Sequence, residues 1–188
     1  MNPVQQPVSG ETEIGKVLHW DGNKKGDDYP MVGLTYEEKQ AYCQSLGAHL
    51  PTAAQIERAA RGVSGTDEYG TPIDKAILRE NGARGTAPVC GVNDERANSF
   101  GVCDLAGNVW ESALDAFDEN FYNHLSSTDP VNPLTDTRQR EELRGGSYLD
   151  NRGDARAANR RSVGSPLDRD YRDGFRCARP RAPKKQIF

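Results

Sequence analysis

Cysteine is scarce in this sequence, which has four cysteines among its 188 residues. Four are too few for a small protein whose fold depends on a dense disulfide framework, and no two of them form a CxxC pair of the kind that holds zinc. Histidine is scarcer still, with three residues, and none is spaced as a helical pair. Cysteine usage therefore leaves the redox compartment of the chain undetermined.

Long apolar runs are also absent, and no stretch reaches the length needed to cross a bilayer. The first ten residues, Met1–Gly10, have neither the basic start nor the apolar run of a signal peptide. We therefore expect a soluble chain; its location is left open, a virion or cell surface included. Excess positive charge is lacking too, since the formal net charge is -4, which argues against general nucleic-acid binding.

The composition fits one compact domain, with 35% hydrophobic and 28% charged residues. We expect a disordered N-terminus over residues 1–13, a single domain over residues 14–180 and a flexible tail over residues 181–188. A capping box at the start and a glycine at the end predict helices over Thr35–Gly47 and Thr52–Gly62. The run Ile14–Trp20 predicts an early strand, and the strings LRGGSYL and GFRCAR predict two later ones.

The most unusual composition lies in Arg144–Arg179, which contains nine Arg, five Asp, two Tyr and no Lys. Arg gives planar bidentate contacts, and Tyr gives rigid amphipathic area, a mixture typical of antibody paratopes. We expect this segment to face a partner. The alternative is a solvated loop held by Arg–Asp pairs, each of which contributes little when exposed.

Five strings occur in order along most of the chain: VGLTYEEKQAYC, HLPTAAQIERAARG, NSFGVCDLAGNVWE, LRGGSY and GFRCAR. Together they resemble the formylglycine-generating enzyme (sulfatase-modifying factor) family. This resemblance implies an α+β, C-type-lectin-like fold with short antiparallel strands, two helices and a high loop content.

Enzymes of that family oxidise a substrate cysteine with copper held by two cysteines that follow the GGS strand, five residues apart. In this chain the corresponding positions fall near Asp150 and Ala155, neither of which is cysteine, and no cysteine occurs between Cys103 and Cys177. A copper thiolate pair therefore has no ligands here. We expect no enzymatic activity and no catalytic residue.

The variable proteins of diversity-generating retroelements share this fold and are a better match in composition. Their C-terminal segment is rewritten at adenines, which favours the residue types found from Tyr148 to Asp173. The resemblance implies a non-catalytic receptor or attachment protein that binds a protein or cell-surface ligand. Two alternatives stay open: a formylglycine-generating oxidase or regulatory pseudoenzyme, and a structural subunit. The sequence does not determine the oligomeric state.

The candidate ligand-contacting residues are polar or aromatic members of this segment, namely Tyr148, Asp150, Asn151, Arg152, Asp154, Asn159, Arg161, Ser162, Asp168, Asp170, Tyr171 and Asp173. A second group is expected to build the scaffold, because paired glycines permit close backbone approach and an aromatic ring buries well. Its members are Arg144, Gly145, Gly146, Ser147, Gly174 and Phe175.

The resemblance implies two further features. We expect no cofactor, but Asn108 and Glu111 stand in a motif that lies near a calcium site in the family and offer hard oxygen ligands. Ser112 follows them where the family usually has a second Trp. Cys43 and Cys177 match the positions of a family disulfide. Cys90 and Cys103 bracket a short loop and could also pair.

Overall fold

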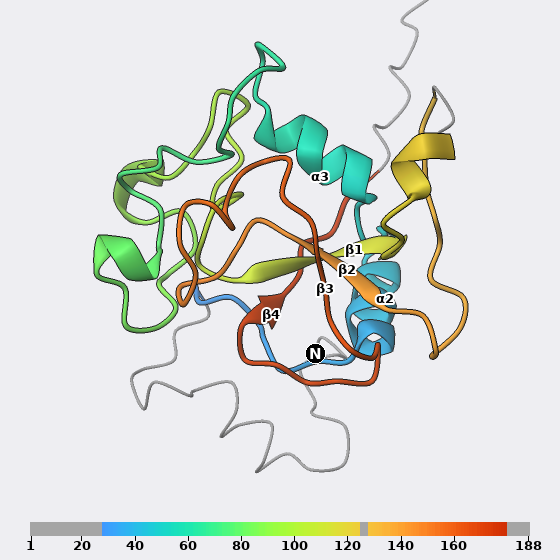
Figure 1. Ribbon diagram of the computed structural model, residues 1–188. Helices are drawn as coiled ribbons and strands as arrows, with labels where there is room; N and C mark the ends of the chain where they lie inside the picture. The colour runs from blue at the N-terminus through green and yellow to red at the C-terminus, as the bar shows by residue number, and fades with distance from the viewer. Residues whose placement is uncertain (1–27, 125–127, 180–188) are drawn as a thin grey trace, which may run out of the picture.

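The computed structural model describes residues 28–124 and 128–179. The expected disordered N-terminus, the strand over Ile14–Trp20 and the tail over residues 181–188 lie outside these residues. Figure 1 shows a small sheet at the centre, with α3 above it, α2 beside it and long loops on the opposite side.

Two helices form where the capping signals predict them. α2 spans Tyr36–Ser45 and α3 spans Ala53–Ala60, and each is preceded by a threonine whose side chain takes part in a complete capping box. Each helix is followed two residues later by a glycine with positive φ, which ends it. Both helix predictions are confirmed.

The sheet has four strands in the order β3-β2-β1-β4. They are β1 (Trp110–Ala116), β2 (Glu141–Arg144), β3 (Arg161–Ser162) and β4 (Asp173–Gly174). β2 pairs antiparallel with both β1 and β3, as expected, whereas β4 pairs parallel with β1. The sheet is therefore mixed, and its longest strand, β1, comes from a region for which no strand is predicted from the sequence.

Three short 3-10 turns punctuate the loops: η1 (Arg79–Asn81), η2 (Val92–Asp94) and η3 (Phe121–His124). None of the helices in the described part of the chain is long and apolar enough to cross a membrane.

The apolar core is divided among small clusters that join the helices to the sheet. One links Ile56 and Ala60 of α3 to Ala113 of β1. Another contains Cys43 of α2, whose disulfide with Cys177 ties this helix to the C-terminal segment. Because a cross-link between distant residues restricts the unfolded chain most, this disulfide stabilises a fold that has little regular structure.

Candidate functional site

Immediately after β2 the chain makes a glycine turn, which lies alongside the segment that leads into β1. Gly145 and Gly146 have φ values of 92° and 78°, and a Cβ atom on Gly146 would lie 3.2 Å from the backbone of Ala155. Only glycine adopts this conformation without strain. The turn places Ser147 and Asp150 beside the indole of Trp110.

The carboxylate of Asp150 is the centre of this region. It accepts hydrogen bonds from Trp110 Nε1 at 2.8 Å, from the Ser147 backbone nitrogen at 3.0 Å and from the Ser147 hydroxyl. Arg161 on β3 approaches from another side, with Nη1 3.6 Å from Asp150 Oδ1 and its guanidinium carbon 5.1 Å from the centroid of the Trp110 ring. The cation therefore lies over an aromatic face beside a carboxylate.

A second ion pair adjoins the first. Arg172 donates hydrogen bonds to both carboxylate oxygens of Asp170. Burial opposes ionisation of Asp170, but the hydrogen bonds from Arg172 outweigh it and hold the pKa of that carboxyl below its usual range, with a further contribution from Arg161. We name Trp110, Asp150, Arg161, Asp170 and Arg172 the Asp150 cluster.

The Asp150 cluster combines two acids and two guanidinium groups around one large ring, that of Trp110, which is only 1% exposed. Its charged side chains are half-buried. Such groups can exchange hydrogen bonds with a partner's carboxylate, guanidinium or amide groups, and their partial exposure leaves room for contact. The chemistry it offers is therefore recognition by planar, directional contacts.

Three of the predicted ligand-contacting residues, Asp150, Arg161 and Asp170, meet in this cluster. Others lie in an adjoining turn, where Asn151 accepts from Arg79 at 3.4 Å and Arg152 donates to Glu80 at 2.6 Å. The remaining polar members shape the loops: Asp154 accepts from the Asn151 nitrogen, Asn159 donates to the Asp154 carbonyl, Asp168 accepts from the Ser165 nitrogen, and Ser162 and Tyr171 are half-buried.

Two predicted contact residues lie in the interior instead. Tyr148 is 1% exposed and Asp173 is 6% exposed. Tyr148 lies two residues after Gly146, within an unbroken run of buried residues, and Asp173 lies on β4, where it pairs with Trp110 of β1. Their burial contradicts the prediction that these two side chains contact a ligand at the surface.

The sequence prediction omits two members of the cluster. Arg172 belongs to the same lysine-free segment as the residues that were chosen, so the signal that identified Arg161 could have included it. Trp110 gave no such signal, because a tryptophan in an apolar string is usually a core residue. Its role depends on a hydrogen bond to a residue 40 positions away.

The arginines of the segment are largely engaged within the protein. Eight of the nine form ion pairs, but only Arg161 and Arg172 pair with aspartates of the segment itself. The other six reach glutamates elsewhere in the chain. The expected Arg–Asp pairing is thus a minor part of a network that ties the segment to the helices, the sheet and the long loops.

The residues present do not fit a copper centre of the resembled enzymes. Asp150 is held by Trp110 and Ser147, and Ala155 is fully buried in a core cluster with Leu78. All four cysteines of the chain form disulfides, Cys43 with Cys177 and Cys90 with Cys103. Neither position offers a thiolate.

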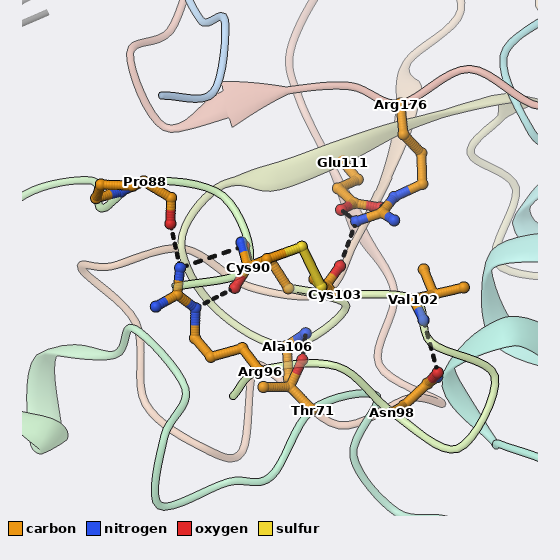
Figure 2. The surroundings of a disulfide bond; sticks show 11 residues. Thr71, Pro88, Cys90, Arg96, Asn98, Val102, Cys103, Ala106, Glu111 and Arg176 are labelled. Atoms are coloured by element: carbon orange, nitrogen blue, oxygen red, sulfur yellow. Dashed lines mark hydrogen bonds and ion pairs between the residues drawn. A yellow bond between two sulfur atoms is a disulfide. The ribbon is translucent and has the colours of Figure 1, made fainter. Parts of the chain in front are cut away.

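The calcium ligands implied by the resemblance are also engaged. The side-chain amide of Asn108 exchanges hydrogen bonds with the backbone of Ala87, at 2.9 and 3.1 Å. The carboxylate of Glu111 pairs with Arg176, as Figure 2 shows. The paired guanidinium of Arg176 supplies the positive charge that a cation would bring, so Asn108 and Glu111 as found do not fit calcium.

Comparison with known proteins places these features in context. The family model described as "Sulfatase-modifying factor enzyme 1-like domain" matches residues 11–181. The chain is 32% identical to the formylglycine-generating enzyme of Streptomyces coelicolor, over 80% of this chain and 52% of that protein. It is also 32% identical to the serine/threonine-protein kinase pkn1 of Chlamydia pneumoniae, over 80% of this chain and 24% of that protein. The chain thus spans about half or less of these relatives.

Solved structures share the fold at low sequence identity. PvdO from Pseudomonas aeruginosa superposes with a TM-score of 0.67 and 22% identity, over 81% of this chain and 62% of that one. Variable protein 1 of Treponema denticola superposes with a TM-score of 0.66 and 20% identity, over 93% of this chain and 75% of that one. The P3c variant of the Major Tropism Determinant superposes with a TM-score of 0.53 and 14% identity, over 76% of this chain and 36% of that one. The expected C-type-lectin-like α+β fold is confirmed.

Proposed function

Because this chain belongs to the sulfatase-modifying factor enzyme 1-like family, we propose that it is a non-catalytic member that binds a ligand through its Arg/Asp/Tyr-rich segment. The ligand is a protein or another cell-surface molecule, and the protein acts as a receptor or attachment protein whose segment is diversified by a retroelement. The contact surface is the Asp150 cluster with the adjoining turn at Asn151 and Arg152.

One observation carries this proposal. At the positions where the resembled enzymes hold copper with two cysteines, this chain has a carboxylate in a recognition cluster and a fully buried alanine. Without thiolates at these positions a redox metal has no soft ligands, whereas the half-buried Asp150 and Arg161, packed against the buried ring of Trp110, form a polar surface suited to binding. The folds of the Treponema variable protein and the Major Tropism Determinant are compatible with such a role.

The absence of oxidase chemistry is tested directly. The purified chain is loaded with Cu(I) and incubated with oxygen and a cysteine peptide of sulfatase sequence, and aldehyde product is followed by mass spectrometry. We expect neither copper uptake nor aldehyde. The control is the variant Asp150→Cys/Ala155→Cys, which restores the thiolate pair and should take up copper. Aldehyde formation by the unmodified chain would favour the alternative of an oxidase.

The binding surface is tested with a panel of purified extracellular proteins and glycans as the probe. For a ligand found in this panel, we expect Arg161→Ala to weaken binding by more than about 1 kcal/mol, because it removes a half-buried cation over an aromatic ring. Arg156→Ala is the matched control, since Arg156 pairs with Glu68 and both side chains are more than half exposed. Equal ligand affinities of the unmodified chain, Arg161→Ala and Arg156→Ala would contradict this assignment of the surface.

Diversification has a separate genetic test. We expect a near-copy of the DNA that encodes Arg144–Arg179, differing at adenines and lying beside a reverse-transcriptase gene. Its absence would remove the retroelement from the proposal and leave the binding function to be judged by the panel.

A further inference from the structure

The loop closed by Cys90 and Cys103 brings three metal-binding groups together. The sulfur atoms of Cys90 and Cys103 and a carboxylate oxygen of Asp94 all lie within 4.8 Å of one another. The two sulfurs form a disulfide, drawn in Figure 2. In this oxidised form they cannot bind a metal ion, because the ligand in proteins is the thiolate.

The backbone around the two cysteines is held by contacts that do not depend on the disulfide. Arg96 is buried and binds the carboxylate of Asp104. It also donates to the carbonyl oxygen of Pro88, as Figure 2 shows. Asp104 also accepts a hydrogen bond from the Cys90 nitrogen at 2.7 Å, and Ala97 forms a β-bridge with Cys103. We therefore expect both cysteines to keep their places after reduction.

The same contacts balance the local charge. Arg96 is a buried cation within this loop, and Asp104 pairs with it directly. On the other side of Cys103, Arg176 donates to the Cys103 carbonyl at 2.9 Å and is paired with Glu111. Because each guanidinium is paired with a carboxylate, neither adds a net positive charge that would repel a cation bound at the sulfurs.

Asp94 completes the donor set. It is exposed, and within residues 28–124 and 128–179 its carboxylate makes no hydrogen bond or ion pair. Its φ of 55° follows a φ of 53° at Asn93, an uncommon conformation that turns the loop back toward the sulfurs. Two thiolates, one carboxylate and an open side toward solvent correspond to a zinc site with three protein ligands and a water.

The two disulfides differ in the length of the loop that they close. Each joins a buried cysteine, Cys103 or Cys43, to a half-buried one, Cys90 or Cys177. Cys90 and Cys103 enclose a short loop, with a separation of 13 residues against 134 for the other pair. A short loop restricts the unfolded chain less, so its opening costs less stability. We therefore expect a dithiol reductant to open the Cys90–Cys103 bond first.

We propose that reduction converts this loop into a Zn²⁺ site whose ligands are Cys90, Cys103 and Asp94. In the first step a dithiol transfers two electrons and two protons to the disulfide and becomes a cyclic disulfide itself. In the second step Zn²⁺ binds both sulfurs and displaces their two protons to solvent. This site is independent of the proposed ligand-binding surface, and bound zinc protects the thiols from reoxidation.

The full-length chain, reduced with a dithiol and freed of excess reductant, is titrated with Zn²⁺ against a chromophoric chelator. Co²⁺ serves as a second probe, because thiolate ligation gives a sulfur-to-metal charge-transfer absorption. We expect one metal ion per chain in the reduced form and none in the oxidised form. Asp94→Asn should weaken Zn²⁺ binding at least about tenfold.

Glu95→Gln is the matched control, because it removes the same charge from the neighbouring exposed residue and should leave the affinity unchanged. Cys90→Ser/Cys103→Ser should abolish both zinc binding and the cobalt absorption. Binding that persists in this variant would place the metal elsewhere in the chain and overturn the proposal. If the double variant does not fold, equal affinities of Asp94→Asn and Glu95→Gln overturn it on their own.

Discussion

Replacing Lys39 with methionine is expected to lower the free energy of unfolding by about 3 to 5 kcal/mol. The Lys39 ammonium lies 3.1 Å from Glu141 Oε1 and 2.7 Å from Ser112 Oγ, and the two charged side chains are only 2% and 3% exposed. Removing the cation leaves the Glu141 carboxylate buried without its counter-charge. Most of the expected loss comes from that unpaired charge.

Urea denaturation followed by circular dichroism measures this change. The matched control is Arg152→Met, which breaks the ion pair with Glu80 at the surface, where the Arg152 side chain is 57% exposed. We expect the control to lose less than about 1 kcal/mol. Equal losses in the two variants would show that burial of the Lys39–Glu141 pair has no energetic consequence.

A double variant separates loss of the pair from loss of packing. Lys39→Met/Glu141→Leu removes both charges and keeps two long side chains, so it should recover most of the stability that Lys39→Met loses. If the double variant is no more stable than the single one, then the methionine packs poorly and the unpaired carboxylate is not the cause.

The buried contacts of Lys39 could not be predicted from the sequence. Ser112 stands where the resembled family usually has a tryptophan, and no local pattern in the sequence explains the change. In the structure Ser112 is fully buried and accepts from Lys39, so the small side chain leaves space that the lysine fills. Lysine is rarely fully buried, and its partners are 73 and 102 residues away, so no local pattern could have predicted it.

The helices could be predicted because their signals are local. Thr35 caps α2 through Glu38, three residues on, and both residues are visible in the sequence. Strand β1 has no comparable signal, because its polar residues are buried rather than alternating with apolar ones. Asp115 accepts from the first nitrogen of α3, and Glu111 pairs with Arg176. These partners become visible only once the chain has folded.

The candidate site was predictable in composition but not in arrangement. The arginine-rich segment identified Asp150 and Arg161, since residue type is read directly from the sequence. It could not separate exposed members from buried ones such as Tyr148 and Asp173, because the glycine turn and the parallel pairing of β4 determine their burial.

Replacing Asp173 with asparagine is expected to stabilise the protein at pH 8 by up to about 4 kcal/mol. Burial raises the pKa of Asp173 to about 7, and the neighbouring Asp170 and Glu141 carboxylates add to the rise, while Lys39 and Arg172 oppose it. An aspartate in the unfolded chain has a pKa near 4. Ionised Asp173 is therefore less favourable in the folded state than in the unfolded state.

The pH dependence follows from this difference. Between about pH 4 and pH 7 the folded protein retains the Asp173 proton that the unfolded chain has released, so the free energy of unfolding falls as the pH rises. Asparagine stays neutral throughout. Asp173→Asn should therefore match the unmodified protein near pH 4 and exceed it increasingly up to about pH 7, with a constant difference above.

Denaturation curves at pH 4, 6 and 8 measure this slope for both proteins. Asp168→Asn is the matched control, because it removes the same charge from an exposed loop position whose hydrogen bond from Ser165 an asparagine can also accept. If Asp173→Asn were no more stable than the unmodified protein at pH 8, the folded state would tolerate the ionised carboxylate. The raised pKa assigned to its burial would then be wrong. A gain shared by Asp168→Asn would instead trace the effect to the net charge of the chain, because both variants remove the same charge and Asp168 is exposed.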